Sequence, residues 1–207
     1  GAEVCGLRMD VSKEADWQKA FQLIEEKYGK LNTLVSNAGV LYERKLVDTS
    51  LEDWNRVVSI NLTGGFLAAK TMYPLLKASG NATILYTVSD ASEMGYPDYA
   101  LYGATKSGLK GFAKYVAAEY VHDNIRCNTV HPGYIDTPMM RNASGVDSIM
   151  GMDMYKNPLG RILSPDEVAE AFVFLASDAA FNINGTSLVM DGGGSSFIAT
   201  SVLDERE

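Results

Sequence analysis

Short apolar runs rich in β-branched residues alternate along this chain with longer stretches in which apolar residues recur at helical spacing. This alternation is typical of βαβ units, which place consecutive strands parallel in one sheet. We therefore expect an α/β fold built on a parallel sheet. The expected strands are "EVCGLRM" (3–9), "LNTLVS" (31–36), "ATILYTV" (82–88), "NIRCNTV" (124–130, ending at Pro132-Gly133) and "TSLVMD" (186–191).

Capping residues mark where the helices begin. Ser12 is predicted to cap the helix after the first strand. Thr49 with Glu52 has the capping-box spacing and predicts a long helix that reaches about Leu76. "SPDE" (164–167) combines a capping box with proline at the first helical position, so we expect a further helix there.

Composition and charge exclude several classes of function. The 207 residues are 46% hydrophobic and 21% charged, which is typical of one globular domain over 1–207. The net charge of -8 and the lack of a basic run argue against nucleic-acid or membrane partners. Without a signal-peptide pattern, we expect a cytoplasmic protein. Cys5 and Cys127 have no metal-ligand spacing, so we expect buried, reduced thiols and no metal site.

Glycine, proline and short polar residues follow each expected strand, at 10–12, 37–40, 89–92, 131–138 and 191–194. In open parallel sheets, ligands bind outside the carboxyl ends of the strands. Such residues suit a close approach of the backbone to a ligand. We therefore expect one shared binding cleft at this edge.

The stretch "YGATK" places Tyr102 four residues before Lys106, on one face of a helix. A nearby cation favours the phenolate and should lower the tyrosine pKa, which would make Tyr102 a general acid/base. The chain has a second match, Tyr73 to Lys77. Only Tyr102 has a polar companion, Ser89, thirteen residues earlier at a strand end. Taken alone, the pentapeptide also fits a structural tyrosine beside a solvated lysine.

Several segments together resemble the classical short-chain dehydrogenases/reductases. They are "SNAGV", with Ser36 in place of the family's first Asn, "INLTGGF", "YTVSDAS" with "YGATKSGLKGFAK", "IRCNTVHPGYIDTPM" and "NPLGRILSPDEVAEAFVFLASD" through "INGTSLVMDGGGS". The resemblance implies a Rossmann-like, doubly wound parallel sheet in three α/β/α layers. It also implies a dehydrogenase that uses NAD or NADP.

The resemblance implies four catalytic residues: Asn61, Ser89, Tyr102 and Lys106. Ser89 would bind the substrate oxygen, Tyr102 would exchange its proton, and Lys106 would lower the tyrosine pKa and bind the nicotinamide ribose. Asn61 would hold a water molecule that connects Lys106 to solvent. A helix-bend role for Asn61 and a strand-end cap for Ser89 are the structural alternatives.

The same resemblance implies a cofactor-binding set. In addition to Tyr102 and Lys106, it comprises Asp10, Val11, Asn37, Ala38, Gly39, Pro132, Gly133, Ile135 and Thr137. Asp10 would accept a hydrogen bond from the adenine amino group. Turn chemistry could also explain these residues, and Asp10 could simply cap the following helix.

The chain departs from the family's pattern at its start, because it begins at the family's third strand. The Thr-Gly-x-x-x-Gly-x-Gly phosphate loop and the second strand, which separates NAD from NADP enzymes, are not in the sequence. We therefore expect an N-terminally incomplete domain. Residues 3–9 would lack a partner strand, and the edge of 31–36 would be exposed.

The segment 139–157 holds five of the nine methionines and corresponds to the family's substrate lid. Methionines adapt to irregular apolar shapes, so we expect a hydrophobic secondary alcohol and its ketone, alicyclic or steroid-like, as the substrate pair. A core-packing loop is the alternative. By analogy with the family, we expect a homo-oligomer, either a tetramer or a dimer.

Two other function classes compete with an alcohol dehydrogenase. One is a non-catalytic relative that has lost its phosphate loop and serves as a binding or scaffold protein. The other is a serine hydrolase, which needs an activating base. His122 and His131 have no evident pairing in the sequence, which disfavours a hydrolase.

Overall fold

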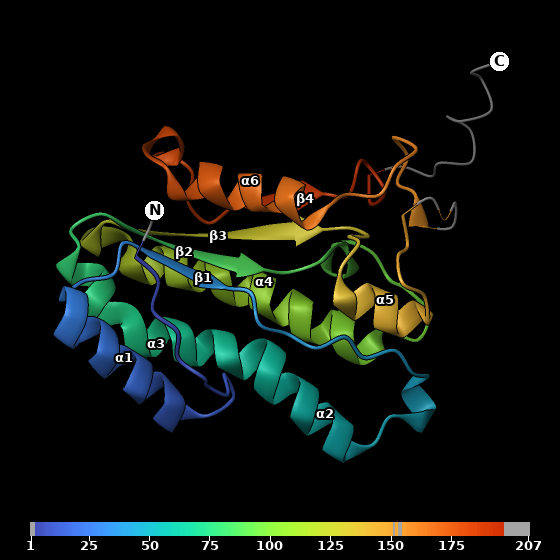
Figure 1. The fold of residues 1–207 in the computed structure, drawn as a ribbon, viewed down its shortest axis with the longest axis horizontal. Helices are drawn as coiled ribbons and strands as arrows, with labels where there is room; N and C mark the ends of the chain where they lie inside the picture. The colour runs from blue at the N-terminus through green and yellow to red at the C-terminus, as the bar shows by residue number, and fades with distance from the viewer. Residues whose placement is uncertain (1–2, 151, 153–154, 197–207) are drawn as a thin grey trace.

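The computed structural model describes residues 3–150, 152 and 155–196. Its centre is a sheet of four parallel strands in the order β1-β2-β3-β4, which confirms the α/β class (Figure 1). The register pairs Leu34 with Ile84 and Ile84 with Cys127. The strands are β1 (Thr33–Ser36), β2 (Ala82–Thr87), β3 (Ile125–Pro132) and β4 (Ser187–Met190).

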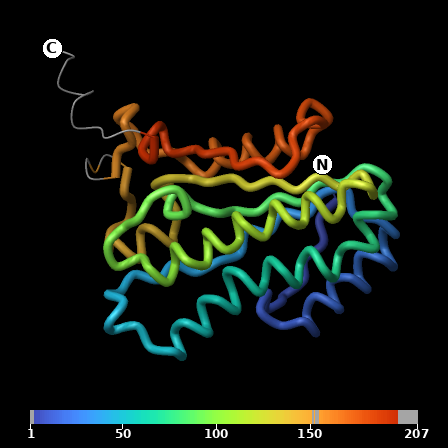
Figure 2. Tube along the Cα trace, turned by 180° about the vertical axis from the view of Figure 1, so that it is seen from behind, coloured from blue at the N-terminus to red at the C-terminus, as the bar shows by residue number. Residues whose placement is uncertain are grey.

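Helices cover both faces of this sheet. Figures 1 and 2 show α1, α3 and α4 on one side and α6 on the other, which confirms the doubly wound, three-layer arrangement. The α-helices are α1 (Glu14–Tyr28), α2 (Leu51–Val58), α3 (Gly64–Ala78), α4 (Ala100–Tyr120), α5 (Pro138–Ser144) and α6 (Pro165–Ala176). Short 3-10 turns are η1 (Leu46–Asp48), η3 (Asp90–Ser92), η4 (Val121–Asp123) and η6 (Asp178–Ala180).

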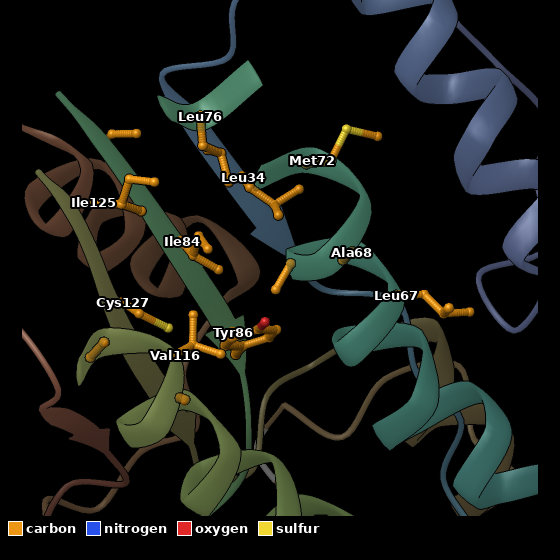
Figure 3. Packing of buried hydrophobic residues seen from close by; sticks show 14 of the residues in the cluster. Leu34, Leu67, Ala68, Met72, Leu76, Ile84, Tyr86, Val116, Ile125 and Cys127 are labelled. Atoms are coloured by element: carbon orange, nitrogen blue, oxygen red, sulfur yellow. The ribbon is translucent and has the colours of Figure 1, made fainter. Parts of the chain in front are cut away.

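Alternation along β2 divides the core between the two faces. Ile84 and Tyr86 pack into the cluster formed with α1, α3 and α4, part of which Figure 3 shows. Leu85 points the other way and packs against α6 beside Val168 and Leu175. Because successive side chains of a strand point to opposite faces, a strand buried on both sides is apolar throughout. "ATILYTV" was predicted to be a buried strand for this reason.

Residues 3–9 do not form the predicted strand. Val4 is 87% exposed, and Cys5 is also exposed rather than buried as predicted, whereas Cys127 is buried. A strand is stabilised by its hydrogen-bond ladder, and none of the described strands pairs with this segment. The outer edge of β1 is free in the described part of the chain, as expected, and Val35 there is 45% exposed.

Two of the three predicted helix caps are wrong by one residue. Lys13, not Ser12, is the N-cap of α1, and it makes no side-chain cap bond. Ser50, not Thr49, caps α2 and accepts a hydrogen bond from the Asp53 backbone N–H. Ser12 lies in a turn that precedes α1. At α2, Ser50 is a capping residue one position closer to the helix than Thr49. The third prediction, a capping box at the start of α6, is confirmed by Ser164 and Glu167.

The long helix predicted up to Leu76 is interrupted in its middle. A π-helical segment (Ser59–Thr63) lies between α2 and α3, and it contains Asn61. An extra residue in a helical turn rotates the side chains that follow and often marks a functional position. Asn61 is 2% exposed and faces inward.

Candidate active site

A cavity of about 610 Å³ lies at the carboxyl ends of the strands. Segments that follow β1, β2 and β3 line it together with α4, α5 and α6. Three of the five segments expected to share a cleft, 37–40, 89–92 and 131–138, contribute to it, whereas 10–12 and 191–194 do not line it. The lining includes nine of the predicted site residues: Asn37, Gly39, Ser89, Tyr102, Lys106, Pro132, Gly133, Ile135 and Thr137.

Tyr102 and Lys106 lie on neighbouring turns of α4, as their spacing predicts. The Lys106 Nζ atom is 5.6 Å from the centroid of the Tyr102 ring. It donates a hydrogen bond of 2.8 Å to the Thr87 carbonyl at the end of β2. The Thr87 hydroxyl in turn donates to the Asn37 side chain at 2.8 Å. Lysine, threonine and asparagine thus connect α4 to the ends of two strands.

The predicted effect of Lys106 on Tyr102 is not what the structure shows. Burial raises the pKa of Tyr102 to about 12, although the Ser89 hydroxyl acts in the opposite direction. Burial also lowers the pKa of Lys106 to about 8. Both shifts have one cause, because removing a group from water disfavours its charged form. Tyr102 therefore keeps its proton at neutral pH.

Asn61 fixes the loop after β1. Its Nδ2 atom donates to the Val40 carbonyl at 3.0 Å, and its Oδ1 atom accepts from the Val40 backbone N–H at 2.8 Å. A third bond of 3.2 Å reaches the Thr105 hydroxyl on α4. Bonds to backbone groups are what the helix-bend alternative for Asn61 requires. The water-holding role of Asn61 stays a prediction.

Two glycines of the cavity wall are packed closely against other residues of the site. A Cβ atom at Gly39 would lie 3.3 Å from Asn61 Oδ1 and 3.5 Å from Lys106 Nζ. One at Gly133 would lie 3.0 Å from the Asp191 side chain. Small residues beside a buried lysine fit the ribose and nicotinamide end of a dinucleotide, whose hydroxyls need donors and a close backbone.

Three of the predicted cofactor residues do not line this cavity: Asp10, Val11 and Ala38. Asp10 is exposed, and its Oδ1 atom accepts hydrogen bonds from the backbone N–H and the hydroxyl of Ser12. These bonds fit the alternative interpretation, in which Asp10 stabilises a turn and does not bind adenine. Val11 packs against the start of α3, where a Cβ atom at Gly64 would come within 3.2 Å of it. Their roles toward adenosine stay predictions.

The second tyrosine–lysine pair is structural, as expected. The Tyr73 hydroxyl donates to Asp123 at 2.6 Å, and Lys77 forms an ion pair with the same carboxylate at 2.8 Å. Neither Tyr73 nor Lys77 lines the cavity.

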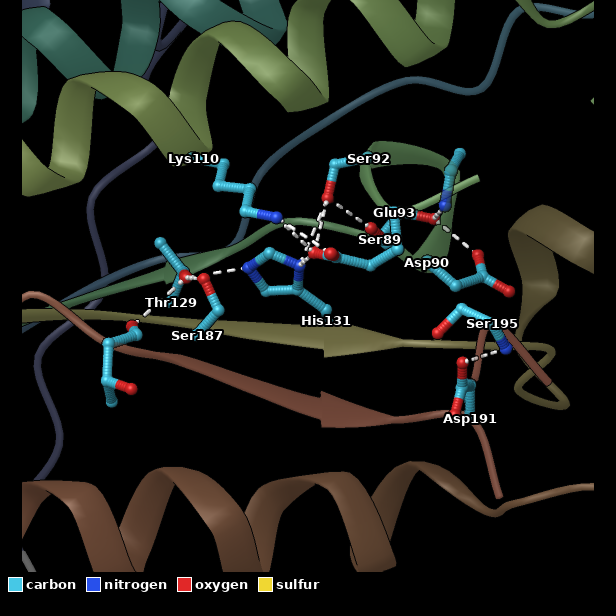
Figure 4. Close-up of polar contacts among 12 residues, drawn as sticks. Ser89, Asp90, Ser92, Glu93, Lys110, Thr129, His131, Ser187, Asp191 and Ser195 are labelled. Carbon is cyan, nitrogen blue, oxygen red and sulfur yellow. Dashed lines mark hydrogen bonds and ion pairs between the residues drawn. The ribbon is translucent and has the colours of Figure 1, made fainter. Parts of the chain in front are cut away.

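A buried polar cluster behind Ser89 was missed in the sequence. Glu93 accepts from Lys110 Nζ at 2.8 and 2.7 Å, and its carboxylate lies 2.6 Å from Nδ1 of His131 (Figure 4). Ser92 donates to the Ser89 carbonyl at 2.8 Å. The cluster, which we call the Glu93–Lys110–His131 cluster, joins α4, the turn after Ser89 and the end of β3.

The pairing of His131 corrects the expectation that it has no partner. Glu93 and the Ser92 hydroxyl both approach the same ring nitrogen, Nδ1, at 2.6 and 3.0 Å. A nucleophilic triad needs the serine and the acid on opposite nitrogens. Burial also lowers the His131 pKa to about 4. The pairing therefore does not supply the base of a hydrolase.

Four polar residues of the cavity wall were not among the named site residues. Asp90 and Tyr134 lie in the segments 89–92 and 131–138 that were expected to border the cleft, whereas Tyr96 and Tyr99 had no such signal. Asp90 is 8% exposed and accepts from the Ser89 hydroxyl at 2.9 Å and from the Tyr96 hydroxyl at 2.8 Å. The tyrosine rings meet edge to face, with Tyr99 and Tyr102 at 6.0 Å between centroids.

The start of the predicted lid contributes to the apolar wall. Met139 and Met140 on α5 line the cavity, whereas Met150 is 53% exposed and Met154 lies outside the described residues. Asp136 anchors this helix, because its carboxylate accepts from Arg141 at 3.0 and 2.9 Å.

Within residues 3–150, 152 and 155–196, no three histidine, cysteine or acidic side chains are grouped so that they could hold a metal ion. The same ranges contain no helix with the length and apolar character needed to cross a membrane.

Comparison with known proteins identifies the family. The family model described as enoyl-(acyl carrier protein) reductase matches residues 1–195. An NADP-dependent (R)-specific alcohol dehydrogenase of Lentilactobacillus kefiri is 35% identical over 90% of this chain and 75% of its own length. A cyclohexanol dehydrogenase of Acinetobacter sp. (strain SE19) is 32% identical over 93% of this chain and 75% of its own length.

A solved structure is similar as well. The gluconate 5-dehydrogenase from Burkholderia cenocepacia J2315, in complex with NADP and tartrate, superimposes with a TM-score of 0.84 at 30% identity. The match covers 92% of this chain and 74% of that one. The parallel sheet, the serine, tyrosine and lysine around one cavity, and the match to these relatives all agree. The chain belongs to the short-chain dehydrogenase/reductase family of NAD(P)-dependent enzymes that act on CH–OH groups.

Proposed function

We propose that this chain interconverts a hydrophobic secondary alcohol and its ketone by hydride transfer to or from NAD or NADP. The observation that carries the proposal is that Ser89, Tyr102 and Lys106, from two separate segments, line one cavity whose remaining wall is largely apolar. The cofactor would supply the hydride chemistry. The relatives named for an alcohol and for cyclohexanol support this substrate class.

Tyr102 is the proton donor and acceptor of the proposed reaction. With its pKa raised to about 12, it carries a proton at neutral pH and can give it to the oxygen of a ketone as that oxygen gains charge. Ser89 lies beside it and would bind the same oxygen. Lys106 places a cation within the cavity, 5.6 Å from the tyrosine ring centroid, and would stabilise the phenolate that remains.

The apolar wall favours a hydrophobic ring or chain on the carbon that reacts. Met139 and Met140 on α5 contribute to this wall together with Val168 and Phe172 on α6. Burying apolar substrate surface there is favourable at roughly 25 cal/mol per Å². A cyclic ketone such as cyclohexanone is therefore the first substrate to test.

The test compares the two tyrosine–lysine pairs of this chain. The full chain is assayed with cyclohexanone and reduced nicotinamide cofactor, using NADH and NADPH in parallel. Tyr102→Phe should lower kcat by a factor on the order of 100 to 10,000, since it removes the proton donor. Tyr73→Phe is the matched control and should keep wild-type turnover, because Tyr73 lies outside the cavity.

Two outcomes would contradict the proposal. If Tyr102→Phe kept wild-type turnover, the proton transfer would not depend on this residue. If the unmodified chain bound a nicotinamide cofactor but reduced no ketone and oxidised no alcohol, the non-catalytic binding protein would be the better interpretation.

We also propose that the chain assembles as a homo-oligomer, either a dimer or a tetramer. Exposed aromatic side chains on two adjacent helices support this: Phe66 on α3 is 42% exposed and Tyr115 on α4 is 73% exposed. Light scattering on the purified chain measures the mass directly, and a monomer at micromolar concentration would contradict the proposal.

A further inference from the structure

Asp90 is the one acidic side chain among the described residues that line the cavity. It is 8% exposed, and no ion pair is formed by it within the described part of the chain. Its two oxygens accept hydrogen bonds from the hydroxyls of Ser89 and Tyr96, which are uncharged donors. The donors to this carboxylate are therefore neutral, and no cation pairs with it among the described residues. Burial, with a smaller contribution from Asp191, raises the pKa of the Asp90 carboxyl above its ordinary value.

A second carboxylate adds to the negative potential at this end of the cavity. Gly133 separates Asp90 from Asp191, because a Cβ atom there would lie 3.4 Å from Asp90 Oδ2 and 3.0 Å from the Asp191 Cβ atom. Figure 4 labels the two acids, Asp90 in the turn after β2 and Asp191 just after β4, with β3 between these two strands in the sheet. Asp191 is 5% exposed, and its carboxylate accepts from the backbone N–H groups of Gly193 and Ser195.

The cavity offers little compensation for a negatively charged ligand. Lys106 is the one lysine or arginine in its described lining. Its Nζ atom donates one hydrogen bond to the Thr87 carbonyl, and its remaining N–H donors are those expected to bind the nicotinamide ribose. Arg141 on α5 is paired with Asp136 at 2.9 Å. With Lys106 committed to the cofactor, no unpaired cation of the described lining would face a substrate carboxylate.

We infer that Asp90 is a specificity residue that restricts the substrate to uncharged alcohols and ketones and excludes hydroxy acids. The inference rests on the proposed function, because it locates the reacting oxygen at Ser89. Asp90 Oδ1 is 2.9 Å from the Ser89 hydroxyl, so a compact substrate bound there lies within a few ångströms of this charge. Like charges at such distances repel strongly in a site that excludes water. An uncharged substrate avoids this repulsion, and its hydroxyls can use the remaining lone pairs of the carboxylate.

The experiment uses two probes of almost the same shape, trans-4-hydroxycyclohexanecarboxamide and trans-4-hydroxycyclohexanecarboxylate. For the full chain, kcat/KM should be higher for the amide by a factor on the order of 30 to 100. Asp90→Asn should reduce this ratio at least about tenfold, because asparagine keeps the shape and the hydrogen-bonding capacity but removes the charge.

The matched control is Asp123→Asn. Asp123 also accepts a hydrogen bond from a tyrosine, Tyr73, at 2.6 Å, but it does not line the cavity. This variant should leave the ratio unchanged. Circular dichroism of each variant confirms its folding before the ratio is compared.

The outcomes decide the inference separately from the proposed function. An unmodified chain that used the acid as well as the amide would overturn the inference, and so would a ratio that persisted in folded Asp90→Asn. If the chain turned over neither probe, the proposed function would fail. Calorimetric binding of the same two probes would then decide the inference, with equal affinities overturning it.

Discussion

Replacing Lys110 with methionine should destabilise the protein through the acid that the lysine leaves behind. The Lys110 ammonium lies 2.7 Å from the Glu93 carboxylate, and the two side chains are only 26% and 20% exposed. The second partner of Glu93 is His131, which is fully buried and whose pKa is lowered to about 4, so it is neutral at pH 7. Without Lys110, the carboxylate keeps its charge but loses its compensating cation.

The size of the effect follows from burial. Removing one partner of a fully buried pair costs about 3–5 kcal/mol. Because each of these side chains keeps some exposure to water, which screens the charge, we expect about 2–3 kcal/mol for Lys110→Met. For a chain of this length each kcal/mol lowers the melting temperature by about 2–4 °C, so the expected decrease is roughly 5–10 °C.

Reversible denaturant unfolding measures this free energy, and a surface pair provides the comparison. Lys70 and Glu14 are 2.8 Å apart, but each is 55% exposed. Lys70→Met should therefore cost no more than about 0.5 kcal/mol.

A double mutant then isolates the pair. Glu93→Gln added to Lys110→Met removes the uncompensated charge, so the double mutant should be more stable than the sum of the two single losses predicts. Strict additivity, or a Lys110→Met cost no greater than that of Lys70→Met, would refute the reasoning.

Two further predictions concern a charge and a helix cap. The pKa of Lys106 is about 8 in the folded chain, below its ordinary value of 10.5. Between pH 8 and 10.5 the unfolded chain therefore binds one more proton at this lysine than the folded chain does. The free energy of unfolding should rise with pH over this range. Lys106→Met should remove that rise from melting temperatures recorded across the range, and an unchanged slope would contradict the assignment. Ser50→Ala should cost about 1 kcal/mol of unfolding free energy because Ser50 caps α2. Thr49→Ala should cost less than about 0.5 kcal/mol in the same measurement, and the reverse order would place the cap at Thr49.

The sequence was informative wherever local spacing decides the outcome. Tyr102 and Lys106 share a helix face because residues four apart on a helix always do. The capping box of Ser164 and Glu167 depends on one turn of chain and was predicted correctly. The buried strand β2 was recognisable because both of its faces are covered, which leaves a mostly apolar run rich in β-branched residues.

The candidate site was predictable in part for the same reason. Ser89 and Gly133 were found because each follows a recognisable strand, and strand ends of a parallel sheet meet at one edge. Tyr96 and Tyr99 line the same cavity but follow no strand directly. Nothing in the local spacing distinguished them from the other tyrosines.

The sequence by itself determined the order of the four strands and of helices α1, α4 and α6, and the pairing of Tyr102 with Lys106 on α4. Tertiary structure alone decided that residues 3–9 form no strand, that burial raises the pKa of Tyr102, and that Glu93 holds His131. The physical reason is common to all three. Helix periodicity is a property of neighbouring residues, whereas a β-ladder, the loss of water around an ionisable group and a buried ion pair each need partners distant in the chain.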